Sequence, residues 1–351
     1  MKGSKRISVL PRDERRATRR ALELLRISKA GFVWSVTAGS LTLVCSVGLA
    51  ALSAWLIARA SQMPLIPTLT LAATGVRAFG ASKPVLRYFR QIAAHRVALY
   101  GMSNLRSAVY RILADSPIDA VTSIRRGDLL ARTGRDVSAV GDLVVRALDP
   151  MAVAAVTSLF SVALVAFFSP ACALALALCL LCTGIASPYC AMRGARIAEL
   201  SQIEDRAELA AVSLTMLDSA SELRVSGRLS ELEAAAARAE ERIFANRDAA
   251  ARPTALATAI DSLAMGAAVV SAIVIGAGQL AAGQLAAVEL AIVVLTPLAA
   301  FEATMPLAGA GIQLVRSAGA SKRIVDLLDS AQPHGASAGP READEAGAVD
   351  E

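Results

Sequence analysis

Residues 151–192 read MAVAAVTSLFSVALVAFFSPACALALALCLLCTGIASPYCAM, two long apolar runs joined only by Ser169 and Pro170. Each run reaches the roughly 20 residues that a helix needs to cross the hydrocarbon core of a bilayer. A helix is also the one open structure that satisfies its own backbone hydrogen bonds in lipid. This stretch therefore predicts two consecutive transmembrane helices with a tight connection between them.

The same arrangement occurs twice more along the chain. Runs 32–58 and 65–86 are separated by a short link, and runs 256–278 and 285–306 are separated by 279–284. The sequence thus predicts an all-α membrane protein with six transmembrane helices.

The distribution of charged residues predicts how these helices are oriented across the membrane. Residues 62–64, 169–170 and 279–284, which split the three pairs of runs, contain no Lys, Arg, Asp or Glu, whereas residues 1–30 carry ten Lys and Arg residues. The two long connections, 87–146 and 193–252, are also rich in arginine. Because positive charge stays on the inner side of a membrane, we expect a multi-pass protein of the cell (plasma) membrane with both termini in the cytoplasm.

The surplus of +6 charges and the pI near 9.3 follow from this topology. A nucleic-acid partner would require aromatic platforms or a basic groove-binding module. Aromatic residues make up only 4% of the chain. The partner that the composition indicates is the lipid bilayer, and no nucleic acid is expected.

The long connections are predicted to be helices that extend far into the cytoplasm. Residues 197–252 are almost free of Gly and Pro and rich in Ala, Leu, Glu and Arg, all of which favour helix. A break is expected near Gly227, at the end of the segment 217–227. The first connection is punctuated by Asp115, Ser116 and Pro117. Two long helix pairs, each with a bend, would act as lever arms.

This architecture resembles the membrane domain of ATP-binding-cassette (ABC) exporters with domain-swapped helices. Within that group the chain is similar to the CydC-type subunit of the heterodimeric exporter needed for cytochrome bd assembly. The motifs that carry the resemblance lie between residues 25 and 329, and they are SVGL (46–49), LSAWLI (52–57), GVR (75–77), RYF (87–89) with His95, GDLLAR (127–132), DVSAV (136–140), ELRVSG (222–227), AAFEA (299–303) and SKRI (321–324).

The resemblance implies a CydD-type sister subunit and a pair of ATPase domains as partners. Closing of the ATPases would push on the two bends of the long connections, and we assign this coupling to Asp115, Ser116, Pro117, Asp218, Glu222 and Gly227. No phosphate-binding loop of the form GxxxxGK[ST] occurs in the chain. We therefore expect no ATP hydrolysis by this chain alone. The predicted organisation is a basic segment (1–30), the six-helix domain (31–329) and a disordered acidic tail (330–351).

His95 is one of two histidines, and the other, His334, lies in the tail. On a helix, His95 shares a line with Arg77, Tyr88 and Gln91. A solvated histidine near the headgroups is the simple interpretation. The resemblance implies instead that His95 is an axial ligand of haem iron between paired membrane domains. Arg87 and Arg90 would pair with the haem propionates. Gln91 stands where family members have an arginine.

Arg77, Lys83 and Glu302 are ionisable groups inside predicted spans, where charge is expensive. Two compatible interpretations arise. Arg77 and Glu302 form a structural pair that locks the second and sixth spans together, or the three residues line a substrate path. The five cysteines all fall in spans and are interpreted as ordinary small apolar residues.

The resemblance favours a membrane subunit that supports cytochrome bd assembly by exporting thiols (cysteine or glutathione) or haem. One alternative is half of a general lipid or drug exporter. Another is a scaffold or haem-sensing subunit that transports nothing.

Overall fold

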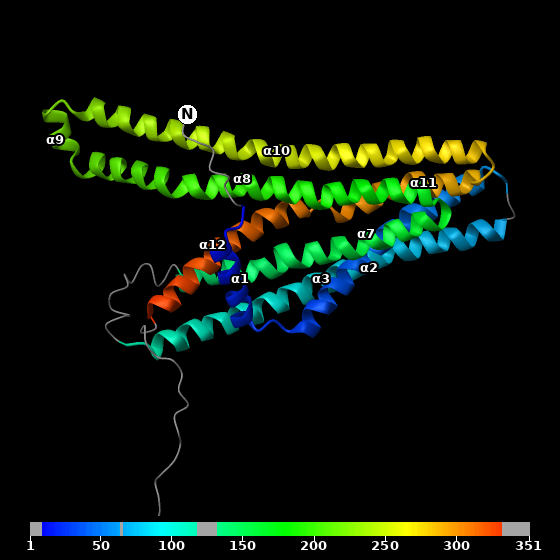
Figure 1. Cartoon of the computed structure of the whole chain (residues 1–351), viewed down its shortest axis with the longest axis horizontal. Coiled ribbons are helices and arrows are strands. Elements are labelled where there is room, and N and C mark those ends of the chain that lie inside the picture. Colours follow the sequence, from blue (N-terminus) through cyan, green and yellow to red (C-terminus); the bar gives the residue numbers. More distant parts are fainter. Residues whose placement is uncertain (1–8, 64–65, 118–131, 332–351) are drawn as a thin grey trace, which may run out of the picture.

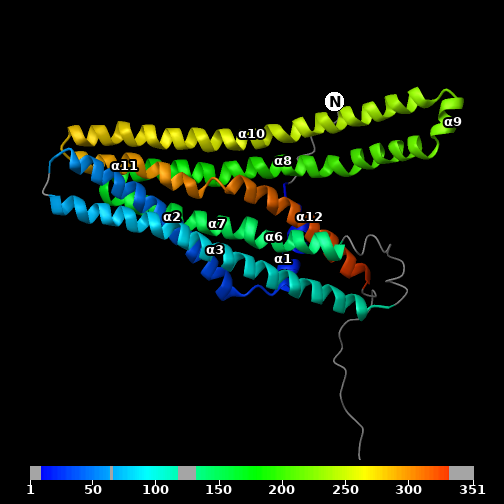
Figure 2. The ribbon, with the colours of Figure 1, turned by 180° about the vertical axis from the view of Figure 1, so that it is seen from behind.

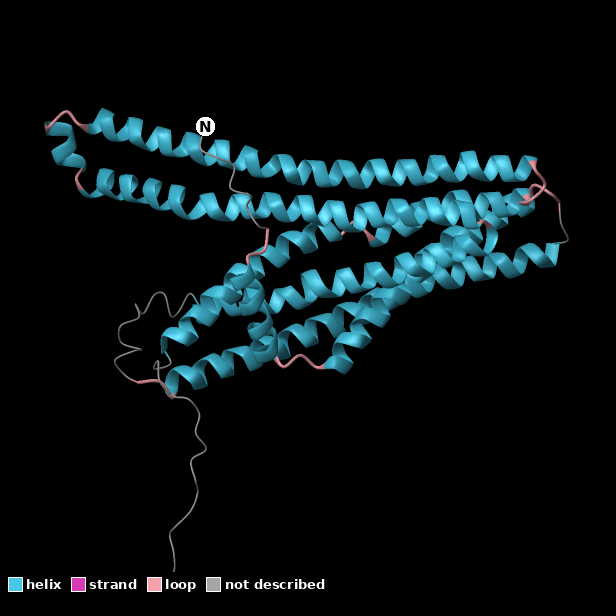
Figure 3. Cartoon of the chain, in the orientation of Figure 1, coloured by secondary structure: helices cyan, strands magenta, loops and turns pink. Residues whose placement is uncertain are grey.

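The computed structural model describes residues 9–63, 66–117 and 132–331, and it describes residues 200–206 and Ile66 by their backbone only. Every regular element in these ranges is a helix (Figure 3), which confirms the predicted all-α class. The elements are α1 (Arg12–Leu25), α2 (Lys29–Ala60), α3 (Ile66–Ala114), η1 (Arg132–Asp136), α6 (Val137–Leu143), η2 (Val144–Leu148), α7 (Asp149–Phe168), α8 (Pro170–Asp218), α9 (Ala220–Val225), α10 (Leu229–Ala281), α11 (Ala287–Ala300), η3 (Phe301–Ala303) and α12 (Leu307–Ala331).

Three tight connections lie together at one end of the molecule, which we call the hairpin end (right in Figure 1, left in Figure 2). They join α2 to α3, α7 to α8 and α10 to α11. At the second connection, the Ser169 hydroxyl caps α8 by accepting a hydrogen bond from the Cys172 N–H at 3.2 Å, and Pro170 occupies the first helical position. At the third, Gly283 adopts φ +69°, which glycine tolerates without strain.

Five helical stretches are long and apolar enough to cross a membrane, within the part of the chain that the structure describes. They are Lys29–Ala60, Arg132–Phe168, Pro170–Glu199, Leu229–Ala281 and Ala287–Ala331. The predicted second span, in α3, is not among them because Arg77 and Lys83 dilute its apolar character. α3 nevertheless packs along α2. The count of six spans stays a prediction.

The last predicted span is not one continuous helix. α11 ends at Ala300, a single 3₁₀ turn follows in η3, and α12 begins only at Leu307. Pro306 explains the interruption, because it has no N–H to donate to the carbonyl of Glu302 one turn earlier. The result is a short stretch of non-α backbone in the middle of an apolar segment.

α8 and α10 pack against each other and project beyond the rest of the bundle at the end opposite the hairpins, which we call the arm end (Figures 1 and 2). They come close because Gly194 has no side chain. A Cβ there would lie 2.6 Å from the carbonyl oxygen of Ala250. The short helix α9 and Gly227, with φ +70°, connect the two long helices. The predicted helical arm and its break near Gly227 are therefore confirmed.

The residues assigned to coupling lie at the arm end. Asp115, Ser116 and Pro117 follow the last residue of α3, while Asp218 ends α8 and Glu222 lies in α9. Part of the first connection, residues 118–131, lies outside the described residues, as does most of the predicted tail with His334.

Candidate functional site

Glu302 lies in the interruption between α11 and α12, where it meets one residue from each of two neighbouring helices. The Lys83 ammonium of α3 is 2.9 Å from Oε1 and 3.0 Å from Oε2 of Glu302. The Ser46 hydroxyl of α2 donates to Glu302 Oε2 at 2.5 Å and accepts from Lys83 Nζ at 2.8 Å. The three side chains thus form a closed triangle that joins three segments.

All three residues lie at a similar depth. Counting at 1.5 Å per residue from the hairpin end of each helix, Ser46 is about 21 Å away, Glu302 about 23 Å and Lys83 about 26 Å. These depths fall within a hydrocarbon core of about 30 Å. Lys83 and Glu302 keep 30% and 39% of their side-chain surface exposed in the single chain. The triangle is therefore open on one side.

A second ion pair lies one layer closer to the arm end. Arg90 follows Lys83 by two helical turns, and its Nη2 is 2.8 Å from Oδ2 of Asp149 in α7. The Ser35 hydroxyl of α2 donates to Oδ1 of Asp149 at 2.8 Å. Gly39 leaves the room for this arginine, because a Cβ would lie 2.9 Å from Arg90 Cδ. We call the six residues of the two layers the polar seam: Ser35, Ser46, Lys83, Arg90, Asp149 and Glu302.

The predicted pairing of Arg77 with Glu302 is wrong, because the cationic partner of Glu302 is Lys83. Positions 77 and 83 are six residues apart, so their side chains leave the helix about 120° apart. The Arg77 side chain is exposed. The seam does contain Lys83 and Glu302, two of the three residues predicted for a substrate path.

The predicted haem-binding residues divide between two faces of α3. Tyr88, Gln91 and His95 are exposed. Arg87 is exposed too, but it follows Lys83 by one helical turn and is close enough to Glu302 for their charges to interact. Arg90 instead points inward to Asp149. No cluster of three or more His, Cys, Asp or Glu residues that could hold a metal ion occurs in the described ranges. The exposed face of α3 thus offers the His95 imidazole and the Tyr88 phenol to a group bound outside the bundle.

A family model for the ABC transporter transmembrane region matches residues 30–299, more than three quarters of the chain. The chain belongs to the ABC transporter transmembrane family. It is a membrane protein with the membrane domain of an ABC transporter, and such domains pair with ATPase domains. The match covers the membrane region only, and no nucleotide-binding domain is detected in the chain.

Two curated relatives are distantly similar. The chain is 24% identical to the glutathione/L-cysteine transport system ATP-binding/permease protein CydC of Escherichia coli (strain K12), over 82% of this chain and 51% of the relative. It is 28% identical to the CydD protein of the corresponding system of Bacillus subtilis (strain 168), over 42% of this chain and 26% of the relative. The predicted resemblance to ABC exporters and to CydC is thus confirmed. The chain spans about half the length of the first relative and about a quarter of the second.

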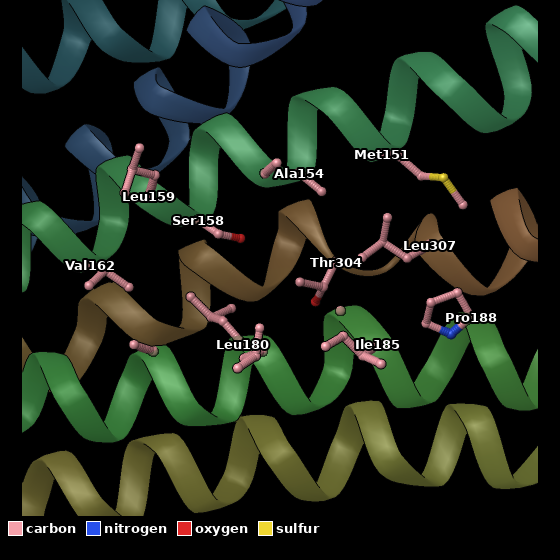
Figure 4. Close-up of a pocket in the computed structure, with 14 residues that line it drawn as sticks. Met151, Ala154, Ser158, Leu159, Val162, Leu180, Ile185, Pro188, Thr304 and Leu307 are labelled. Atoms are coloured by element: carbon pink, nitrogen blue, oxygen red, sulfur yellow. The ribbon is translucent and has the colours of Figure 1, made fainter.

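Two cavities lie between the apolar helices of this ABC membrane domain. One of about 550 Å³ lies between α7, α8 and the segment after η3, where Ser158 and Thr304 are among few polar residues on an apolar wall (Figure 4). Pro188 lines the same cavity from α8. A second, of about 720 Å³, lies between α2, α3 and α7 and includes Trp55 and Phe79. Both could hold apolar molecules.

Sequence reasoning missed several residues of the site. Ser35 and Ser46 gave no signal, since serine is common in membrane helices. Asp149 was overlooked because it precedes the apolar run 151–168 by two residues. Asp261 did offer a signal, as a carboxylate inside the predicted span 256–278, and it accepts a hydrogen bond from Ser187 of α8 at 3.0 Å.

We predict that Lys83→Met and Glu302→Met each lower the melting temperature of the purified chain, and that the double variant is more stable than either single variant. Removing one partner leaves the other charge unpaired, whereas removing both avoids that cost. Breaking a fully buried pair lowers the free energy of unfolding by about 3–5 kcal/mol. Each single variant here should lose less than that, because both side chains are partly exposed.

Arg77→Met is the matched control, because it removes a cation from the same helix without touching Glu302. Thermal unfolding in detergent measures all four variants. Equal destabilisation by Arg77→Met and Lys83→Met would contradict the assignment of Lys83 as the partner of Glu302.

Proposed function

We propose that this chain is the membrane-spanning half of a CydC-type heterodimeric exporter, with six spans and with both termini and the arm end in the cytoplasm. The observation that carries the proposal is the similarity to CydC over 82% of the chain. The printed name of that relative describes glutathione and L-cysteine transport. We infer that this chain moves the same class of small thiols, or haem, together with a CydD-type sister subunit.

The polar seam supports an amino-thiol cargo. Cysteine and glutathione each carry carboxylate and ammonium groups at neutral pH. A cargo carboxylate can take the place of Glu302 beside the Lys83 ammonium, and a cargo ammonium can take the place of Lys83 beside Glu302. Because both side chains are partly exposed, they are open to such an exchange from one side of the chain.

The α8–α10 helix pair and the end of α3 would couple the ATPase domains to the membrane helices. ATPase domains of the assembled transporter would press on α9 and on residues 115–117, which lie at the ends of long helices. α8 and α10 pack along each other, and the exposed Arg242–Glu208 ion pair at 2.6 Å bridges them; we infer that they carry that motion as one unit. The motion then reaches the level of the polar seam.

We predict ATP-dependent accumulation of labelled glutathione or cysteine in inverted membrane vesicles that contain this chain, its CydD-type sister and the ATPase domains. Lys83→Met should reduce accumulation by about tenfold or more, the effect of losing a charge-assisted contact. Arg193→Met, outside the seam, is the matched control. Export of lipophilic dyes without thiols would instead indicate a general lipid or drug exporter. A fully assembled complex that transports neither thiols nor dyes would favour the scaffold or haem-sensing alternative.

A haem-binding role is the second candidate, and the exposed face of α3 favours it. Tyr88, Gln91 and His95 are free of the bundle and available at an interface with a sister subunit. Bound haem would supply an iron that accepts an axial imidazole. The His95 imidazole would hold it and the Arg87 guanidinium would attract a propionate. Arg90 is engaged with Asp149, so it is the least suited of the proposed set.

We predict that His95→Ala abolishes the Soret band of haem that co-purifies with the heterodimer, because it removes an axial ligand outright. His334→Ala is the matched control and should leave the band intact. Visible absorption spectra of the purified complexes provide the measurement. An unchanged spectrum in the His95→Ala complex would show that His95 is not the ligand.

A further inference from the structure

Asp261 of α10 is a carboxyl group inside an apolar stretch of helix, and it lies outside the polar seam. Its Oδ2 accepts a hydrogen bond from the Ser187 hydroxyl of α8 at 3.0 Å, and Ser187 is fully buried. The second oxygen of Asp261, Oδ1, is buried and has no hydrogen-bond partner. Within the described residues, one neutral hydroxyl is therefore the only hydrogen-bond partner of this carboxyl group.

The position of Asp261 along α10 lies within the apolar part of the helix. α10 carries no Lys, Arg, Asp or Glu between Asp261 and its hairpin end at Ala281, a length of about 30 Å at 1.5 Å per residue. Toward the arm end, the first charged residue is Arg252, about 14 Å further along α10. The first charged residue after Ser187 on α8 is Arg193, about 9 Å along. Arginines that flank a span lie at its membrane boundary, so Asp261 lies on the lipid side of that boundary.

No charged group compensates Asp261 within the described residues. α10 packs against α8 and α11 and also touches α9 and α12. Ser187 is the one side chain that interacts electrostatically with Asp261. The nearest titratable or charged residues along these helices are Cys182, Tyr189, Cys190 and Arg193 of α8, Glu222 and Arg224 of α9, Arg252 of α10, Glu289 of α11 and Arg316 of α12. None of them forms an ion pair or a hydrogen bond with Asp261 in the described part of the chain.

A neutral carboxylic acid fits these surroundings better than a carboxylate. An ionised carboxylate without a cation is costly in an apolar environment, and such a group takes up a proton instead. The protonated Oδ2 of Asp261 can donate to the Ser187 oxygen, and the serine hydroxyl can then donate to the carbonyl one turn earlier in α8. Thr296 and Ser161 make such bonds in α11 and α7, at 2.7 and 2.8 Å. The contact between Asp261 and Ser187 is therefore kept in the neutral state.

Glu302 has the opposite surroundings in the same chain. Its carboxylate accepts from the Lys83 ammonium at 2.9 and 3.0 Å and from the Ser46 hydroxyl at 2.5 Å. A neighbouring cation and two donors favour the ionised form of a carboxyl group. The chain thus holds two carboxyl groups at membrane depth whose surroundings favour different protonation states.

We propose that Asp261 is a proton-binding site of the membrane domain, which carries its proton while α10 packs against Ser187 and ionises when water reaches this contact. The proposal rests on the apolar surroundings of α10 and not on the cargo or the sister subunit of the proposed function. Both helices continue from the contact into the arm. A rearrangement of the α8–α10 pair that admits water would release the proton, and its reversal would take one up.

Dicyclohexylcarbodiimide tests the proposal on the purified full chain, because this apolar reagent enters hydrocarbon and reacts with protonated carboxyl groups. The acid O–H adds across one C=N bond, with the oxygen bonding to carbon and the proton to nitrogen. The acyl group then moves to nitrogen, and no atom is lost. Peptide mass spectrometry should locate one reagent molecule on Asp261. Glu302 is the matched internal control and should carry at least about tenfold less label, because the reaction follows the protonated fraction.

Asp261→Asn gives a second measurement that does not depend on access of the reagent. Asparagine keeps the size of the side chain and a donor toward Ser187, but it has no acid proton. The infrared spectrum of wild type should contain the carbonyl band of a protonated carboxylic acid, and this band should move on transfer to D2O. The Asp261→Asn chain should lose both the band and the label while its melting temperature stays unchanged.

Three outcomes would overturn the proposal. The first is an infrared difference between wild type and Asp261→Asn that contains no acid carbonyl band. The second is equal labelling of Asp261 and Glu302, which would show that their protonation states do not differ. The third is loss of the Asp261 label when sodium or potassium chloride is added at constant pH, which would indicate a site for a metal cation.

Discussion

The ion pair between Lys83 and Glu302 is the interaction on which the membrane part of this structure depends. Ionisable side chains inside membrane spans are costly, so they pair with one another or face a water-filled cavity. The Ser46 hydroxyl completes the triangle and ties α2, α3 and the interrupted last span together at one depth. Arg90 and Asp149 repeat the arrangement one layer away. Both cations and both carboxylates of the polar seam are thus paired between helices.

The interruption after α11 places polar groups at membrane depth. Non-α backbone is tolerated at membrane depth where it is buried in protein or lines a water-filled cavity. Here it sets Glu302 against Lys83 and places Thr304 on the wall of a 550 Å³ cavity. α12 continues from that interruption to the arm end. α12 also packs along α8, and we propose that motion of the α8–α10 pair changes the surroundings of Glu302 through this contact.

The sequence predicted which segments form helices, but it did not predict which side chains pair between those helices. Apolar run length and the Ser169–Pro170 link predicted the hairpins, and Gly227 predicted the bend of the arm. The partner of Glu302 and the inward direction of Arg90 could not be predicted, because both depend on how α3 is rotated against its neighbours. That rotation is set by packing, which no single stretch of sequence encodes. The interruption at residues 301–306 had a signal in Pro306, but a proline alone does not distinguish a kink from a break.

The central claim is that the polar seam faces a water-filled path and is more than a dry structural lock. Cysteine accessibility tests it most directly: Ser46→Cys, in a background without other cysteines, is exposed to a membrane-impermeant thiol reagent in inverted vesicles of the assembled transporter. Val47→Cys, fully buried beside it, is the dry control. The account predicts that position 46 reacts, that glutathione slows the reaction, and that position 47 stays unmodified. If position 46 is as inert as position 47 in both the resting and the ATP-driven transporter, the seam is a structural lock and the path lies elsewhere.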